Sequence, residues 1–406
     1  MDKTFKIGLL RETKTPPDKR VAIPPAQAKE LKEMYPQVDI VAQPSELRCY
    51  ADSEYVEAGI PLQEDVSDCD LLIGVKEVKI EALLPGKSYL FFAHVAKKQP
   101  HNRKLIQAIA QKGITLLDHE YLTNPKGERL VAFGHWAGVV GAYNGLIAYG
   151  KRTGQFELPR AKDCHDYQEL VGILKKTKLH QARILITGGG RVAAGALEIF
   201  RTLGVQEVEP EEYLTKQFDK PVVCRLDPWH YAQRKDGKPF DWQFWLSNPT
   251  DHTSTFVPYT KVTDLFVACH FWDFRSPIFF RKEDMKAPDF SIKVIADVSC
   301  DIPGPIPTTL RATTIADPFY DYSIEQDEEV PAFSGENNVT TVTIDNLPGE
   351  LPRDASEYFG KIMVNTVIPH FLGNDEEGVV KRATILRDGK LTDLYQYLQD
   401  YLEGKG

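Results

Sequence analysis

A glycine-rich turn at 188–190 carries the clearest chemical signal in the sequence. The β-branched run ILIT at 184–187 leads directly into it, and a helical pattern follows. The spacing Gly188-x-Gly190-x-x-Ala193 in such a strand–turn–helix predicts a site for the pyrophosphate of a dinucleotide. Glycine permits the tight turn and lets the backbone approach the phosphates, which the amides at the helix N-terminus then face. The residues expected at this site are Gly188, Gly189, Gly190, Arg191, Val192 and Ala193.

The strand that follows this turn bears on the choice between NAD and NADP. We expect that strand at 207–210, EVEP. Glu209 then takes the position that contacts the adenosine ribose, about 20 residues beyond the turn. An acidic group there favours the free 2′-hydroxyl of NAD, whereas Arg191 in the turn suits the 2′-phosphate of NADP. The sequence therefore predicts NAD or NADP and does not decide between them. A glycine-rich connection that binds nothing is the competing interpretation, and the correct flanking elements count against it.

A second group of polar residues stands at the ends of predicted strands in the first 130 residues. Short apolar runs alternate there with helical patterns, which is typical of a parallel sheet covered on both faces. Polar residues just beyond the carboxyl ends of such strands line the ligand crevice. The residues in such positions are Arg11, Lys76, His94 and Glu120. The strands expected here are 5–10, 38–43, 69–76, 88–94 and 114–120, with helices at 25–35 and 99–113.

The length of 406 residues favours two domains, because a single hydrophobic core stops growing at a smaller size. A long helix is predicted at 134–153, before the glycine-rich turn. The segment 209–252 is rich in Pro, Asp, Lys and Trp and reads as an irregular insertion. Helical patterns at 354–373 and 393–404 follow, and we expect the last of them to pack on the first domain.

Composition limits the classes of partner. The formal net charge of −9 and the scattered Lys and Arg argue against nucleic acid as the main partner. The six cysteines are far apart and show no metal-ligand spacing, so free thiols are favoured and no metal centre is expected. Anionic small molecules stay compatible with this charge, because a few local cations can bind them.

One apolar stretch invites a membrane interpretation. Residues 131–149 are largely apolar, but they include His135, Asn144 and four glycines. A buried helix is favoured over a single membrane span. The N-terminus shows no apolar region of a signal peptide, so we expect a soluble, cytoplasmic protein with no membrane partner.

Strings along the whole chain resemble one protein superfamily. The string GLLRETKTPPDKRVAIPP near the N-terminus resembles the opening of alanine dehydrogenases and transhydrogenases. Further strings, in the same order along the chain, resemble lysine-forming saccharopine dehydrogenases and the lysine–ketoglutarate reductase half of the bifunctional lysine-degrading enzyme. The pairing of GVK with FFAH points to the saccharopine branch. These strings are GVKEV (74–78), FFAH (91–94), RLVAFGHWAGVVG (129–141), EVEPEEY (207–213), ADVSCDIPGPIP (296–307) and IDNLPGELPRDASEYFG (344–360).

The resemblance implies an α/β fold of two Rossmann-like domains with parallel sheets. The dinucleotide-binding domain would be inserted into a split substrate domain, with the active site in the cleft between the two. On this basis we expect the N-terminal part of the substrate domain at 1–135 and the dinucleotide domain at 136–345. The chain would then return to the substrate domain at 346–406, where the Rossmann alternation no longer continues.

The resemblance also implies an activity and an acid–base pair. It implies an NAD(P)-dependent oxidoreductase that interconverts saccharopine with L-lysine and 2-oxoglutarate through an imine, with hydride transfer to or from nicotinamide. Lys76 and His94 match the family's acid–base residues. A lysine whose pKa is lowered by burial, or a histidine, suits such proton transfers. Taken alone, Lys76 could be a solvated strand-end lysine and His94 a structural histidine.

Further site residues are implied in the same way. Arg20 matches an active-site arginine, whose planar fork can bind a carboxylate through two hydrogen bonds. Arg129 is a second candidate for the dicarboxylate, Lys14 and Glu77 are expected to assist, and Glu120 to tune Lys76 electrostatically. Surface salt bridges are the competing interpretation for each. In the second domain, Asp301 and Asp345 match positions of the superfamily near the cofactor, Asp345 against the nicotinamide.

Two other functions stay open from the sequence. One is an alanine-dehydrogenase-like enzyme that deaminates a small amino acid. The other is a nucleotide-binding regulatory protein that has lost catalysis, which predicts missing acid–base residues although Lys76 and His94 are both present. The lysine-forming and lysine-degrading directions share these motifs. A homo-oligomer is compatible with the superfamily, whose members range from monomers to hexamers.

Overall fold

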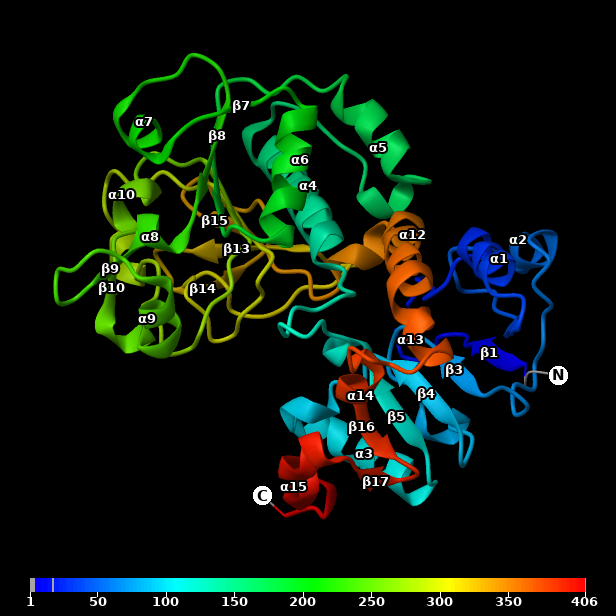
Figure 1. Ribbon diagram of the computed structural model, residues 1–406. Helices are drawn as coiled ribbons and strands as arrows, with labels where there is room; N and C mark the ends of the chain where they lie inside the picture. Colours follow the sequence, from blue (N-terminus) through cyan, green and yellow to red (C-terminus); the bar gives the residue numbers. More distant parts are fainter. Residues whose placement is uncertain (1–3, 17, 406) are drawn as a thin grey trace. The chain divides into compact units, whose positions relative to one another are not determined.

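The computed structural model describes residues 4–16 and 18–405, and the chain divides into two compact units (Figure 1). Unit 1 combines Met1–Phe133 with Pro352–Gly406, and unit 2 is Gly134–Leu351. The sequence-based division set these boundaries at 135/136 and 345/346. Each unit is built around its own sheet.

Unit 1 contains a seven-stranded sheet in the order β17-β16-β5-β4-β3-β1-β2 (Figure 1). The five strands from the N-terminal part of the chain run parallel, and the two C-terminal strands extend the sheet in antiparallel fashion next to β5. The strands are β1 (Phe5–Leu9), β2 (Val38–Ala42), β3 (Leu71–Ile73), β4 (Ser88–Phe91), β5 (Thr115–Asp118), β16 (Thr384–Arg387) and β17 (Lys390–Leu391).

Helices and apolar clusters cover both faces of this sheet. Successive residues of β3 alternate between two hydrophobic clusters, with Leu71 and Ile73 in one and Leu72 in the other. This period of two is expected for a strand buried on both faces. The C-terminal segment packs on the second cluster, where the Tyr401 hydroxyl donates to the Gln99 carbonyl, as predicted. The helices are α1 (Pro25–Met34), α2 (Asp52–Glu57), α3 (Arg103–Gln111), α12 (Pro352–Ile362), α13 (Ile368–Leu372), α14 (Val379–Ala383) and α15 (Gln399–Leu402).

Unit 2 contains an eight-stranded sheet in the order β14-β13-β15-β12-β11-β6-β8-β7. The six strands from β15 to β7 in this order are parallel, and β13 and β14 add an antiparallel edge. The strands are β6 (Arg183–Thr187), β7 (Gln206–Glu207), β8 (Val222–Leu226), β11 (Leu265–Ala268), β12 (Val294–Asp297), β13 (Phe319–Ser323), β14 (Glu328–Val330) and β15 (Val339–Val342), with the separate pair β9 (Ala232–Arg234) and β10 (His252–Ser254).

The structure corrects the sequence analysis on one strand of this sheet. The segment 209–252 is not simply an insertion, because it contains β8, the parallel neighbour of β6. The strand expected at 207–210 is only the two-residue β7 at the sheet edge. Charged and proline-rich sequence on both sides hid the apolar start of β8, although Val222, Val223 and Cys224 are fully buried.

Helix α4 (Gly134–Thr153) spans the predicted range and is buried over most of its length. The Asn144 side-chain NH₂ group donates to the Val140 carbonyl and to Glu350 Oε1, so the donor inside the apolar stretch is satisfied. In the described part of the chain, no helix is long and apolar enough to cross a membrane. The other helices of unit 2 are α5 (Tyr167–Leu174), α6 (Arg191–Thr202), α7 (Pro210–Thr215), α8 (Pro228–Tyr231), α9 (Trp242–Ser247), α10 (Val257–Thr260) and α11 (Lys282–Met285).

Glycines allow α4 and α6 to pack closely. A Cβ added at Gly138 would lie 1.8 Å from the Val192 carbonyl oxygen, and one added at Gly195 would lie 2.1 Å from the His135 carbonyl oxygen. Each neighbour is backbone, which cannot yield by a change of rotamer. This contact fixes α6, and with it the glycine-rich turn from which α6 begins.

Gly195→Ala should therefore destabilise the protein by at least about 1–3 kcal/mol, the usual cost of overpacking. Urea unfolding of the variant and the wild type measures the difference. Gly172→Ala in α5 is the matched control, because a Cβ there meets no heavy atom within 4 Å. That control should be neutral or stabilising by up to about 1 kcal/mol, since alanine is the better helix former. Equal stability of the two variants would contradict this description of the helix contact.

Candidate active site

A buried ion pair stands at the edge of unit 1 where the parallel strands end. Asp18 and Arg20 are each 2 % exposed at their side chains. Arg20 Nε donates to Asp18 Oδ1 at 3.0 Å and Arg20 Nη2 donates to Oδ2 at 2.6 Å, while the guanidinium lies 4.2 Å from the ring centre of Phe133. Burial opposes ionisation of Asp18, but the charge and hydrogen bonds of Arg20 outweigh it and hold the Asp18 pKa well below its usual range.

This pair changes the interpretation of Arg20. The sequence analysis expected its fork to meet a substrate carboxylate, whereas Nε and Nη2 form that fork with Asp18. Asp18 was not among the predicted site residues. The spacing Asp-x-Arg, with both residues between a strand end and a proline-bounded helix start, was a usable signal for a local pair.

Lys76 follows β3, the strand next to β1, and is partly exposed. Burial lowers its pKa, and the positive charge of Arg20 lowers it further, partly offset by Asp18. Beside it, Lys14 Nζ forms an ion pair with Glu77 Oε2 at 3.0 Å. The surroundings of Lys76 thus shift its pKa downward, which is the direction that acid–base catalysis near neutral pH requires.

His94 follows β4 and adopts a left-handed backbone conformation with φ 53°. That region is uncommon for a residue other than glycine and is enriched at functional positions. Its Nδ1 lies 3.6 Å from Glu120 Oε2. Glu120 also pairs with Lys97 Nζ at 2.9 Å and with Arg129.

Glu120 is 4 % exposed at its side chain, yet it stays ionised. Burial opposes its charge, but the contacts with His94 and Lys97 and the charge of Arg129 lower its pKa to about 2. Its contacts are therefore with His94, Lys97 and Arg129, whereas the sequence analysis expected it to act on Lys76. Lys97 was not predicted, although it lies three residues beyond His94.

Two further carboxylates at this edge were missed by the sequence analysis. Glu12 accepts hydrogen bonds from the backbone of the turn that carries Lys76, and Asp118 accepts them from the turn that carries His94. Neither contact involves a side-chain partner, so no pattern of opposite charges in the sequence indicated it.

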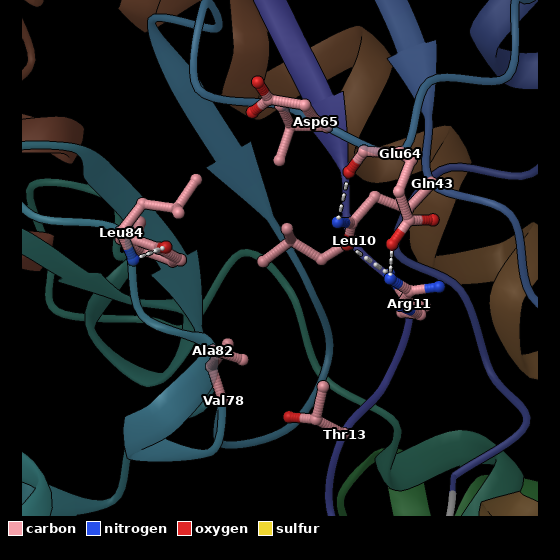
Figure 2. Close-up of a pocket in the computed structure, with 11 residues that line it drawn as sticks. Leu10, Arg11, Thr13, Gln43, Glu64, Asp65, Val78, Ala82 and Leu84 are labelled. Carbon is pink, nitrogen blue, oxygen red and sulfur yellow. Dashed lines mark hydrogen bonds and ion pairs between the residues drawn. The ribbon is translucent and has the colours of Figure 1, made fainter.

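Arg11, which the sequence analysis placed at this edge, lines a neighbouring cavity of about 120 Å³ (Figure 2). It forms an ion pair with Glu64, and its backbone N–H donates to Gln43 Oε1. Thr13 also lines this cavity, whereas Glu12 between them contacts the backbone of Val75 and Lys76. Arg11 and Thr13 therefore line the cavity, whereas Glu12 contacts the turn that carries Lys76.

In unit 2, the glycine-rich turn leaves the N-terminus of α6 open. Gly188 has φ +105°, and a Cβ there would lie 2.6 Å from the Cys269 carbonyl oxygen, so glycine is needed for the turn itself. A Cβ on Gly190 would meet no heavy atom within 4 Å, and no side chain caps the helix. Arg191 is exposed, Val192 partly exposed and Ala193 fully buried. The open space before uncapped amides fits a phosphate group.

Asp227, which was not predicted, is an acidic residue in contact with this turn. Asp227 follows β8, and a Cβ on Gly189 would lie 2.4 Å from Asp227 Oδ1. Glu209 is exposed and precedes α7, next to the short edge strand β7. Arg225 Nη1 donates to Asp227 Oδ1 at 2.6 Å and to the Gly188 carbonyl at 3.2 Å. An acid that suits ribose hydroxyls and a cation that suits a phosphate thus lie together, which is compatible with NAD or NADP.

Asp301 and Asp345 follow β12 and β15 respectively, at the same edge of the unit 2 sheet as the glycine-rich turn. Burial and the charge of Asp297 raise the pKa of Asp301 to about 6. Asp345 is exposed, and its backbone N–H donates to the Thr313 carbonyl. All six cysteines are free. Among residues 4–16 and 18–405, no three His, Cys, Asp or Glu side chains are arranged to hold a metal ion.

Comparison with known proteins gives consistent relatives. Residues 8–140 match the family model "Alanine dehydrogenase/PNT, N-terminal domain". The chain is 30 % identical to the mitochondrial alpha-aminoadipic semialdehyde synthase of Rattus norvegicus, over 98 % of this chain and 48 % of that protein. It is 25 % identical to the saccharopine dehydrogenase [NAD(+), L-lysine-forming] of Emericella nidulans, over 96 % of this chain and 98 % of that protein. The chain thus spans about half the length of the mammalian relatives it matches.

Solved structures show the same fold. An L-alanine dehydrogenase superimposes with a TM-score of 0.67 at 16 % identity, covering 98 % of this chain and 99 % of the other. A transhydrogenase from Sinorhizobium meliloti superimposes with a TM-score of 0.61 at 17 % identity, covering 95 % and 100 %. At these identities the likeness establishes the α/β fold.

Gly190→Val should abolish dinucleotide binding and leave the protein folded. Gly190 has the extended dihedrals φ −95° and ψ −166°, which valine also adopts, and its Cβ would meet no protein atom. The side chain would instead fill the space before the α6 amides. Calorimetric titration with NADH and with NADPH measures binding, and thermal melting checks the fold. Wild-type affinity in the folded variant would contradict the assignment of the phosphate site.

Proposed function

Because this chain is a homologue of the lysine-forming saccharopine dehydrogenases, within the alanine dehydrogenase/transhydrogenase superfamily, we propose that it is an NAD(P)-dependent oxidoreductase that interconverts saccharopine with L-lysine and 2-oxoglutarate. The observation that carries the proposal is the edge of unit 1. There, a lysine whose pKa is lowered by its surroundings and a histidine beside a buried, ionised carboxylate follow adjacent parallel strands, β3 and β4.

Lys76 and His94 are the proposed acid–base residues. Condensation of the lysine ε-amine with the keto group of 2-oxoglutarate requires a neutral attacking amine, protonation of the oxygen that leaves as water, and deprotonation of the nitrogen. A neutral Lys76 can accept a proton in these steps, and its lowered pKa favours that state. We propose that Glu120, whose Oε2 lies 3.6 Å from His94 Nδ1, orients the His94 ring and leaves Nε2 to exchange the proton.

Cations at the same edge are proposed to bind the substrate carboxylates. Arg20 is held rigidly by Asp18, Arg129 is half exposed beside Glu120, and Lys14 is exposed beside Glu77. We propose that Arg129 binds the dicarboxylate, that Arg20, whose Nε and Nη2 are bound to Asp18, supports substrate binding through its positive charge, and that Lys14 and Glu77 assist. A cation held in place by a carboxylate loses little conformational entropy when the substrate binds.

The glycine-rich turn of unit 2 is proposed to bind the dinucleotide, NAD or NADP. The open space at Gly190 and the uncapped α6 amides fit the pyrophosphate, and Asp227 is proposed for the adenosine ribose. Asp301 and Asp345 are proposed to line the cofactor beyond the ends of β12 and β15. When bound, the cofactor supplies or accepts the hydride that interconverts the imine and the secondary amine of saccharopine.

The proposed partners are small molecules, namely lysine, 2-oxoglutarate and saccharopine, and the proposed location is the cytoplasm. Six free cysteines without a disulfide are typical of a reducing compartment. Subcellular fractionation tests the location, and recovery with a membrane or organelle fraction would contradict it.

A panel of assays tests the reaction. With L-lysine, 2-oxoglutarate and NADH or NADPH supplied separately, the protein should oxidise at least one reduced cofactor and form saccharopine, which mass spectrometry detects. With pyruvate and ammonia the rate should be lower by orders of magnitude. Turnover of pyruvate and ammonia alone would favour an alanine-dehydrogenase-like enzyme. Dinucleotide binding without turnover of either pair would favour a regulatory protein.

Lys76→Met and His94→Gln should each lower kcat by about 10²–10⁴, the usual contribution of general acid–base catalysis, and leave cofactor affinity nearly unchanged. The two residues act on the same proton transfers, so the double variant should lose less than the product of the single losses. Each single variant should also lose one limb of the pH profile of kcat/KM. Strictly multiplicative losses with both limbs retained would show that these residues are not the acid–base pair.

A further inference from the structure

The turn that carries Lys76 is held by a carboxylate from the neighbouring strand. Glu12, three residues beyond the end of β1, accepts a hydrogen bond at Oε1 from the Val75 N–H at 2.6 Å and at Oε2 from the Lys76 N–H at 2.8 Å. β1 and β3 are parallel neighbours, so the carboxylate reaches across from one strand end to the next. Both of its oxygens are used on the backbone of this one turn.

The turn that carries His94 is held in a related way. Asp118, the last residue of β5, accepts at Oδ2 from the N–H groups of Ala93 at 3.2 Å and His94 at 3.1 Å. Its Oδ1 accepts from the Glu120 N–H at 2.9 Å. β4 and β5 are parallel neighbours, so this contact repeats the arrangement at Glu12 on the adjacent pair of strands.

Such contacts determine where the acid–base side chains stand. A carboxylate is an acceptor without donors, and two converging N–H groups fix the direction of the chain between them. His94 has a left-handed conformation that a non-glycine residue seldom adopts unless its surroundings impose it. Asp118 also holds the N–H of Glu120, so one side chain sets both members of the contact between His94 and Glu120.

We propose that Glu12 and Asp118 are paired positioning residues, each of which places one acid–base residue by holding the backbone of its turn. The inference rests on the proposed function for the roles of Lys76 and His94. Neither carboxylate touches substrate in this account. They act through the backbone, whereas Arg20 and Glu120 act through charge and side-chain contact.

Ionisation of these carboxylates sets the pH range in which the turns are held. Burial raises the pKa of Glu12 to about 7, an effect that Asp18 increases and Arg20 opposes, and burial also raises the pKa of Asp118, which faces His94 and Glu120. When Glu12 and Asp118 are ionised, both oxygens of each carboxylate accept hydrogen bonds. At a pH below its pKa, each carboxyl group carries a proton on one oxygen, which then accepts more weakly. The hold on each turn is therefore lost as the pH falls.

The free energy of unfolding depends on the ionisation of Glu12 in the opposite direction. Because the folded-state pKa of Glu12 lies above its ordinary value, the folded protein is stabilised by protonation and loses that stability as the pH rises toward about 7. A carboxylate that served only to stabilise the fold in its ionised form would instead have a lowered pKa in the folded state. Activity and stability should therefore respond in opposite directions to the ionisation of Glu12.

Glu12→Gln and Asp118→Asn test the proposal, because each replaces one acceptor oxygen by an NH₂ group that faces a backbone N–H. The controls are Glu64→Gln and Asp68→Asn, which change exposed carboxylates of unit 1 paired with Arg11 and Lys6. Each test variant should lower kcat by about tenfold to a hundredfold, the scale expected for a displaced catalytic group, with smaller changes in KM and in cofactor affinity. The controls should match the wild type.

Two measurements extend the test beyond turnover. In Glu12→Gln, the acid side of the pH profile of kcat/KM should become less steep, because one of the groups whose ionisation supports activity is gone, and the free energy of unfolding at pH 8 should stay within the range of the controls. Acylation of Lys76 by an N-hydroxysuccinimide ester at pH 7, followed by peptide mass spectrometry, should slow several-fold, because a loosened turn moves the amine toward water and raises its pKa. Amide hydrogen exchange at 75–76 and at 93–94 should accelerate in the respective variants.

The outcomes separate this inference from the proposed function. Unchanged kcat and unchanged Lys76 acylation in folded variants would overturn the positioning role, as would a loss of activity explained by a matching loss of stability. If the wild type forms no saccharopine, the proposed function fails, and acylation and exchange still decide whether the carboxylates hold the turns.

If a variant does not fold, amide hydrogen exchange at 75–76 and 93–94 is measured in the wild type between pH 8 and 5.5 and corrected for intrinsic rates. Protection at these amides should be lost on acidification. Constant protection would overturn the proposal.

Discussion

Asp18 and Arg20 lose nearly all contact with water at the edge of the unit 1 sheet, and their mutual hydrogen bonds compensate for that loss. Removing either partner would leave a buried charge without compensation, so the pair is required as a unit. The pair also acts on its neighbour Lys76, because the Arg20 guanidinium lowers the pKa of that amine in addition to the effect of burial. The chemistry proposed for unit 1 depends on this arrangement, because an ordinary solvated lysine would be protonated near neutral pH.

The parallel sheet explains why so many charges meet at one edge. β1, β3, β4 and β5 are neighbours in the sheet and end on the same side, so residues separated by up to about a hundred positions in the chain come together. Four titratable or charged groups at this edge are held in one of two ways. Arg20 and Glu120 have side-chain partners of opposite sign, whereas Glu12 and Asp118 bind backbone N–H groups. The result is a set of polar groups with fixed positions around Lys76 and His94.

Much of this organisation could be predicted from the sequence, for identifiable reasons. The glycine-rich turn is a local motif whose spacing is fixed by sterics, and α4 is one uninterrupted apolar helix, so both were located correctly. The strand-end pattern placed Arg11, Lys76, His94 and Glu120 at one edge of a parallel sheet, and only the family resemblance singled out Lys76 and His94 as an acid–base pair. By contrast, β8 was missed because its short apolar run lies inside charged sequence, and Asp227, which follows β8 beside the glycine-rich turn, was missed with it. Glu12 and Asp118 could not be found, because a carboxylate bound to backbone amides leaves no complementary side chain to detect.

The titration of Lys76 tests the central claim most directly. In protein labelled with ¹⁵N at its lysine side chains, the Lys76 signal can be assigned by its absence from Lys76→Met and followed by NMR over the alkaline range. The account predicts that the Lys76 amine titrates clearly below the value of about 10.4 typical of exposed lysines. Titration at or above that value would contradict the claim that burial and Arg20 prepare this amine for acid–base chemistry.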